Sequence, residues 1–137
     1  MSICASCNAR QERPCTYVPM TREYYRVLVR ALRHVAYRNG YALTVHGSLK
    51  TDIDLVAVPW REGAVSQENI AEEIRSTAEK IIGVARKRQF DVCPEQKPCG
   101  RLAWSFYLVP EGISGPYIDL SVMPILRPVP AKRMPRK

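Results

Sequence analysis

Apolar residues recur every three or four positions after Thr21. The members of this series are Tyr24, Leu28, Ala31 or Leu32, and Val35. This spacing places them on one face of an α-helix, and the turn-forming pair Asn39–Gly40 predicts its end. A second series at helical spacing begins after Ser66, a residue that can cap a helix. It consists of Ile70, Ile74, Ala78, Ile81 and Ala85. We predict that this second helix runs on into the basic residues 86–88.

Four segments have the pattern of β-strands. Residues 41–46 alternate loosely, and residues 52–58 follow after a short connection. Only Leu49, Lys50 and Thr51 separate Ser48 from Asp52, so we expect adjacent antiparallel strands. Residues 55–58 are apolar at every position, which predicts a central strand that is covered on both faces. Further strands are predicted at 102–109 and 117–123.

The predicted order is helix, strand, strand, helix, strand, strand. This order indicates an α+β fold with helices packed on a mixed or mostly antiparallel sheet. We assign 21–124 to this core, because 137 residues suit one domain. Residues 1–20 hold three cysteines without apolar periodicity, which predicts an irregular arm. Residues 125–137 are basic and rich in Pro, which predicts a flexible tail.

The charge balance favours partners that carry phosphate. Lys and Arg number 21 against 13 Asp and Glu, a formal net charge of +8. We therefore expect nucleotides, RNA or another nucleic acid among the partners. Five cations of the tail contribute to this charge with no acid to offset them. They are Arg127, Lys132, Arg133, Arg136 and Lys137.

Arginines also recur along the first predicted helix. They are Arg22, Arg26, Arg30 and Arg33. A solvated helix face is one interpretation of this pattern, and a face that contacts the phosphates of a nucleic acid is the other.

No apolar run approaches the roughly 20 residues that a membrane span needs, so we expect no membrane association. The first residues lack the basic start and apolar stretch of a secretory signal, which predicts a cytoplasmic protein.

Three of the five cysteines lie close together in the sequence as Cys4, Cys7 and Cys15. Thiolates of this spacing are candidate ligands for a structural Zn²⁺, which needs a fourth ligand. The candidates for the fourth ligand are Cys93, Cys99, His34 and His46. Free thiols are the alternative.

Two aspartates at alternate positions carry the clearest chemistry. Asp52 and Asp54 flank Ile53 in a predicted strand, so their side chains project from the same face. In the last predicted strand, Asp119 lies on the same face as Ser121. Crowded carboxylates in apolar strands are costly unless a cation or hydrogen bonds neutralise them. The three acids therefore form a candidate site for Mg²⁺ or Mn²⁺ that holds a triphosphate.

The sequence VHGSLKTDIDL at 45–55 resembles the signature of the nucleotidyltransferase superfamily, in which Gly-Ser ends one strand and Asp-x-Asp begins the next. The resemblance implies an NTP as substrate, with Gly47 and Ser48 on its β- and γ-phosphates. It also implies that Asp52 and Asp54 ligate both metal ions. Asp119 would be the third acid, which helps to activate the attacking hydroxyl. The transferred group would be the NMP.

This chain has a shorter connection between Gly-Ser and Asp-x-Asp than the superfamily usually has. It leaves no room for the helix whose N-terminus would face the phosphates. Lys50 and Arg101 are candidates to bind the phosphates directly, with a loop charge and a strand-end charge as the alternatives.

A second resemblance extends further along the chain. The segments DLVAVPW at 54–60, KPCGR at 97–101 and YIDLSVMP at 117–124 are similar to small uncharacterised proteins of tailed bacteriophages. This resemblance would place the protein in the cytoplasm of a host cell. Three functions therefore stay open: a nucleotidyltransferase, a degenerate module that binds nucleotide or RNA, and a phage protein that binds and inhibits a host or defence factor.

Overall fold

The computed structural model describes residues 21–50, 52–83, 94–109 and 115–126, together with two short strands near the N-terminus. These strands, β1 (Ser2–Ile3) and β2 (Arg10–Gln11), pair antiparallel. The zinc-ligand candidates Cys4, Cys7 and Cys15 and the tail from residue 127 lie outside the described residues.

The first helix, α1 (Arg22–Arg38), confirms the helix predicted from the apolar spacing. Its N-terminus is capped by Thr21, whose side chain accepts a hydrogen bond from the backbone N–H of Tyr24 at 3.2 Å. Of the predicted buried face, Tyr24 is exposed and Tyr25 is fully buried instead, while Val29 and Ala36 are buried in addition. Both tyrosines precede Leu28 at helical spacing, so the sequence pattern alone does not distinguish them.

The second helix, α2 (Gln67–Ile82), begins at the predicted cap and ends earlier than predicted. The Ser66 hydroxyl accepts a hydrogen bond from the N–H of Asn69 at 3.2 Å. Gly83 follows the last helical residue in the left-handed conformation, with φ of 75°, which ends a helix. Ile81, predicted to be buried, is exposed. Residues 84–93, which include Ala85, lie outside the described residues.

Five strands form a mixed sheet in the order β3-β4-β7-β6-β5. The strands are β3 (Tyr41–His46), β4 (Ile53–Pro59), β5 (Glu95–Gln96), β6 (Leu102–Tyr107) and β7 (Tyr117–Val122). The central pair, β4 and β7, is parallel, and the other neighbours are antiparallel. The predicted α+β class is confirmed, as is the antiparallel pairing of β3 with β4. The sequence pattern did not predict β5, which leads into the 3₁₀ turn η1 (Pro98–Gly100).

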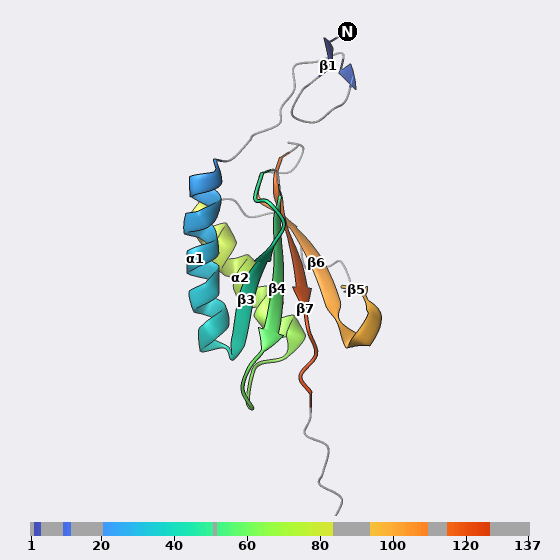
Figure 1. Ribbon diagram of the computed structural model, residues 1–137. Coiled ribbons are helices and arrows are strands. Elements are labelled where there is room, and N and C mark those ends of the chain that lie inside the picture. Colours follow the sequence, from blue (N-terminus) through green and yellow to red (C-terminus); the bar gives the residue numbers. More distant parts are fainter. Residues whose placement is uncertain are drawn as a thin grey trace, which may run out of the picture.

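Helices α1 and α2 lie on the same face of the sheet (Figure 1). The core fills the space between them, where Leu28, Ile74, Ile53 and Leu120 are fully buried. Neither described helix has the length and apolar character that crossing a membrane requires.

The opposite face of the sheet, which we call the open face, carries the side chains that alternate with the core residues. On β4 these side chains belong to Asp54, Val56 and Val58. Val56 is half-buried and Val58 is 41% exposed. The expectation that β4 is covered on both faces is therefore wrong, although β4 does lie between two strands. Apolar residues on both faces here mark an exposed apolar surface rather than a second layer of helices.

Candidate functional site

A row of four polar side chains crosses the open face from β3 to β6. We call it the acidic row, and it consists of His46, Asp54, Asp119 and Ser105. His46 pairs with Asp54, Asp54 with Asp119, and Asp119 with Ser105. Residues that pair in neighbouring strands project from the same face with Cβ atoms about 5 Å apart. The structure therefore brings Asp54 and Asp119 side by side in the two central strands.

Hydrogen bonds orient two of the three candidate carboxylates. The Ser105 hydroxyl donates to Asp119 Oδ1 at 2.9 Å. The Tyr117 hydroxyl donates to the carboxylate of Asp52. The negative charge of Asp52 is the largest cause that raises the pKa of Tyr117, followed by burial and by Asp119. Asp52 thus lies beside the start of β7, next to the acidic row.

The pKa of Asp54 is raised above its ordinary value. Burial is the largest cause, and the charges of Asp119 and Asp52 add to it. His46 acts in the opposite direction. Because Asp54 responds to both other aspartates, the three carboxylates share one electrostatic site. Among the described residues, no Lys or Arg forms an ion pair with Asp54 or Asp119.

The Gly47–Ser48 turn lies directly against Asp54. Gly47 has φ of 95°, in the region that favours glycine, and a Cβ atom built on it would lie 3.1 Å from Asp54 Oδ2. Leu49 also has positive φ, 55°, and is half-buried against the core. Ser48 and Lys50 are exposed on either side of Leu49. The short β3–β4 connection thus places exposed polar groups near the carboxylates.

Arg101 lies away from the acidic row. It precedes β6 and is four residues from Ser105, or about 13 Å along an extended strand. Its Nε is buried and has no hydrogen-bond partner among the described residues.

Of the five cysteines, Cys99 lies within the described residues, and it is an exposed free thiol.

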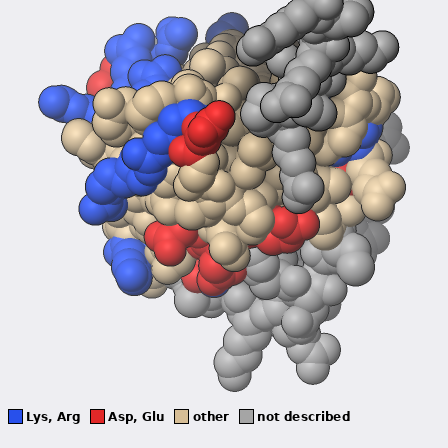
Figure 2. All heavy atoms as spheres, turned by 90° about the horizontal axis from the view of Figure 1, so that it is seen from below, with Lys and Arg blue, Asp and Glu red and all other residues tan. Residues whose placement is uncertain are grey.

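The four arginines of the predicted series are all exposed, and they differ in their contacts. Arg26 forms a solvent-exposed ion pair with Glu23 at 3.8 Å. Arg33 instead donates from Nε to the carbonyl of Leu43 at 3.2 Å, on the edge strand β3. Figure 2, which views the molecule from below, shows most of the visible Lys and Arg side chains on the left of that surface. Asp and Glu side chains are more frequent near its centre and lower edge (Figure 2).

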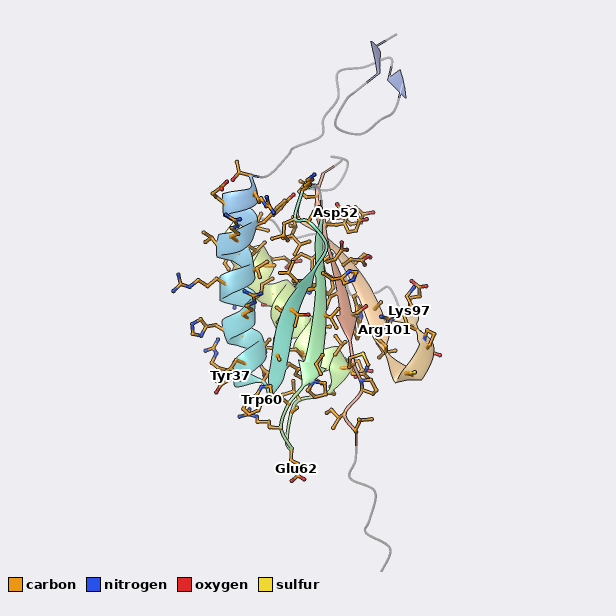
Figure 3. All side chains as sticks on the ribbon, viewed as in Figure 1. Tyr37, Asp52, Trp60, Glu62, Lys97 and Arg101 are labelled. Carbon is orange, nitrogen blue, oxygen red and sulfur yellow. The ribbon has the colours of Figure 1, made fainter. Side chains whose placement is uncertain are left out.

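An apolar groove occupies the other end of the open face. It has a volume of about 780 Å³. Its apolar lining includes Val56, Val58, Trp60, Met123, Ile125 and Leu126. Figure 3 labels Asp52 near the upper end of the sheet and Trp60 near the lower end, so the groove extends from beside the acidic row toward the lower end of the sheet. The sequence pattern was not interpreted as a groove. The feature that indicates it is the pair of apolar residues Val56 and Val58 at alternate positions, on the face opposite the core.

The donor chemistry of the acidic row suits a hard divalent cation, which binds carboxylate oxygens. A cation between two neighbouring carboxylates relieves their mutual repulsion, and the charge of Asp119 adds to burial, the larger cause, in raising the pKa of Asp54. In the part of the chain that the structure describes, no three His, Cys, Asp or Glu side chains already form a metal-binding group. Asp54 and Asp119 are therefore the pair on which a metal site would be built.

Comparison with models of known protein families gave no match, and comparison with curated proteins gave none either. The function is therefore inferred from the geometry of the open face.

Proposed function

We propose that the acidic row binds Mg²⁺ or Mn²⁺ together with the phosphates of an NTP, and that the protein transfers the NMP to a hydroxyl acceptor. The observation that carries this proposal is the register of β4 and β7, which pairs Asp54 with Asp119 on the open face. Paired carboxylates that present oxygens to one cation are a common basis of phosphoryl and nucleotidyl transfer. The resemblance of residues 45–55 to the nucleotidyltransferase signature supports the same function.

Each residue of the site has a specific part in this proposal. Asp54 and Asp119 hold the cation, and Ser105 orients Asp119 through its hydrogen bond. Asp52 joins them when its side chain turns away from Tyr117. The bound cation would supply charge neutralisation at the phosphates. Gly47 allows the β3–β4 turn to lie close to Asp54, where a larger residue would fill the space.

The short β3–β4 connection changes how the phosphates are held. No helix begins at the described residues between Ser48 and Asp52, so they offer the phosphates no N–H groups of a helix N-terminus. Lys50 is exposed in this connection and supplies a flexible positive charge. Arg101 is about 13 Å from the row along β6, so we assign phosphate binding to Lys50 in preference to Arg101.

Nucleotide binding without transfer is the second candidate function. It is favoured by the hydrogen bond from Tyr117 to Asp52, which leaves Asp54 and Asp119 as a pair suited to one cation. Transfer by the two-metal route would need enough carboxylates to hold two ions, and Asp52 would supply the third. The two candidates differ in whether Asp52 takes part.

The proposal is tested by thermal unfolding with and without Mn²⁺ or Mg²⁺ and ATP. Ligand that binds the native state raises the melting temperature by mass action, and we expect this increase for the wild type. Asp54→Asn and Asp119→Asn should abolish it. Glu73→Gln is the matched control, because it removes one exposed carboxylate from α2, which lies on the other face of the sheet. An increase that persists in both aspartate variants would contradict the proposed site.

Transfer itself is tested by mass analysis of RNA and protein after incubation with each NTP and Mn²⁺. A mass increase of one NMP supports the enzyme. If Asp52→Asn abolishes the product but retains the thermal shift, Asp52 acts in transfer rather than binding. Binding without any product would favour the second candidate.

A further inference from the structure

We infer that the apolar groove holds the nucleoside of the nucleotide whose phosphates the acidic row binds. This inference rests on the proposed function, and it assigns the substrate class of the site as a whole nucleotide rather than a polyphosphate.

The groove continues directly from the acidic row along the same two strands. Val56, which lines the groove, is the next residue after Asp54 on the open face of β4. On an extended strand this step is about 7 Å, and Val58 lies about 13 Å from Asp54. Ser121 pairs with Val56 and is the next open-face residue after Asp119. A ligand that extends along β4 from the carboxylates therefore enters the groove.

Two segments form the walls of the groove and are held in place by specific contacts. Beyond β7, the N–H of Met123 donates to the carbonyl of Ala57 at 2.9 Å, which keeps this segment beside β4. Ile125 and Leu126 then follow as one wall. This hydrogen bond fixes the first residue of that wall beside the sheet.

The opposite wall is the turn that follows β4. The Trp60 ring stacks on Tyr37 of α1, with centroids 5.1 Å apart and planes 20° apart. The guanidinium of Arg61 lies 5.3 Å from the Trp60 ring centroid and donates to the carbonyl of Arg38 at 2.8 Å. Figure 3 shows Tyr37 and Trp60 next to each other at the lower end of α1. The wall is therefore preorganised by α1.

The size and chemistry of the groove fit a nucleoside. Small-molecule sites typically enclose about 300–1,000 Å³ and are lined mainly by apolar side chains, and this groove of about 780 Å³ falls within that range. Val58, Trp60 and Leu126 are 41%, 47% and 85% exposed, so a ligand would remove much apolar surface from water. Most of the lining is apolar, and Arg61 and Glu62 are the charged residues in it that can contact the edge of a base.

The test compares MgATP with magnesium tripolyphosphate, which has the phosphates but lacks the nucleoside. We expect calorimetry to show tighter binding of MgATP to the wild type. The double variant Val56→Thr with Val58→Thr keeps side-chain shape but adds hydroxyls to the groove floor, and it should weaken MgATP binding about tenfold. Tripolyphosphate binding should be unchanged. Val27→Thr is the matched control, because Val27 is 65% exposed on α1.

Leu126→Ser provides a second variant that does not depend on the sheet, because Leu126 lies beyond β7. This variant should also weaken the binding of MgATP without changing the binding of tripolyphosphate. If MgATP and tripolyphosphate bind the wild type equally, or if the groove variants weaken both ligands alike, the inference is overturned while the proposed function stands. If neither ligand binds in the presence of Mg²⁺, both the inference and the proposed function fail. If the groove variants leave both affinities unchanged, the groove holds some other ligand and the inference is overturned.

Discussion

At the residue scale, the environment of Asp54 disfavours its charged form. Burial, Asp119 and Asp52 all raise its pKa, and only His46 opposes them. The phenol of Tyr117, whose pKa is also raised, faces the same carboxylates. Ionisation of a carboxyl group in such an environment lowers the stability of the fold. Groups of this kind are concentrated at functional sites, where the charge can bind a ligand.

The raised pKa of Asp54 predicts a pH-dependent effect of Asp54→Asn. An acid whose pKa is higher in the folded state contributes stability below its unfolded pKa, near 3.8, and that contribution is lost as pH rises through the folded pKa. Relative to the wild type, Asp54→Asn should therefore become more stable as pH rises over this range and then reach a plateau. Urea unfolding of both proteins in metal-free buffer, from acid to neutral pH, measures the difference. A difference that does not change with pH would contradict the prediction.

Gly47 has two separate reasons to be glycine, and a matched pair of variants separates them. Its φ of 95° is unfavourable for other residues, and its Cβ position lies 3.1 Å from Asp54 Oδ2. Gly63 has φ of 76° with open space around its Cβ position. Gly63→Ala should cost about 1 kcal/mol of unfolding free energy through backbone strain alone. Gly47→Ala should cost more and should also weaken Mn²⁺ binding.

Chemical denaturation and calorimetry of the two glycine variants provide the measurement. Equal losses of stability, with Mn²⁺ affinity unchanged in both, would show that the contact between Gly47 and Asp54 has no role in the site.

At the element scale, α1 supports the sheet with one arginine and presents others to solvent. Arg33 donates to the Leu43 carbonyl on β3, the outer strand of the sheet. Such a contact satisfies an edge carbonyl that would otherwise be open to another strand. Arg26 and Arg30 remain on the exposed surface of the helix. The sequence places all three in one arginine series, and only the packing of α1 on β3 separates their roles.

This separation predicts different effects of replacing the arginines. Arg33→Ala should lower the free energy of unfolding by about 1 kcal/mol, because the hydrogen bond to Leu43 is lost. Arg30→Ala, the matched control on the same helix, should stay within about 0.5 kcal/mol of the wild type. Thermal or urea unfolding compares the two. Equal stability of both variants would show that the contact with β3 is unimportant.

At the scale of the whole molecule, the positive charge lies in two places. Residues 127–137 hold five cations and no acid, so the remainder of the chain carries +8 minus 5, or +3. The exposed arginines of α1 belong to a packed helix. Such a fixed surface can distinguish nucleic acids by their shape, whereas we expect the tail to respond mainly to their charge.

Removal of residues 127–137 should therefore flatten the salt dependence of RNA and DNA binding without changing the preference between them. Each phosphate contact contributes about 0.7–0.9 to the log–log slope of affinity against salt. Arg26→Ala with Arg30→Ala should alter the preference itself. Binding of both nucleic acids over a salt series, for the wild type and the two variants, is the measurement. Absence of wild-type binding even at low salt would remove nucleic acid from the partners.

The sequence alone determined the elements that depend on local pattern. The spacing of apolar residues predicted α1 and the start of α2, and Ser66 caps α2 as expected. The short segment after Ser48 predicted the antiparallel pair of β3 and β4. Alternation along one strand likewise predicted that Asp52 and Asp54 project from the same face, although β4 begins at Ile53, after Asp52. These features could be predicted from the sequence because each depends on residues within a few positions of one another.

The tertiary structure decided the features that depend on distant parts of the chain. The parallel pairing of β4 with β7 places Asp119 opposite Asp54, and a shift of one residue would have turned Asp119 to the other face. The packing of both helices on one face left Val56 half-buried and Val58 exposed, and it created the groove. Strand partners and helix positions are chosen by the burial of the whole core, which no local pattern contains.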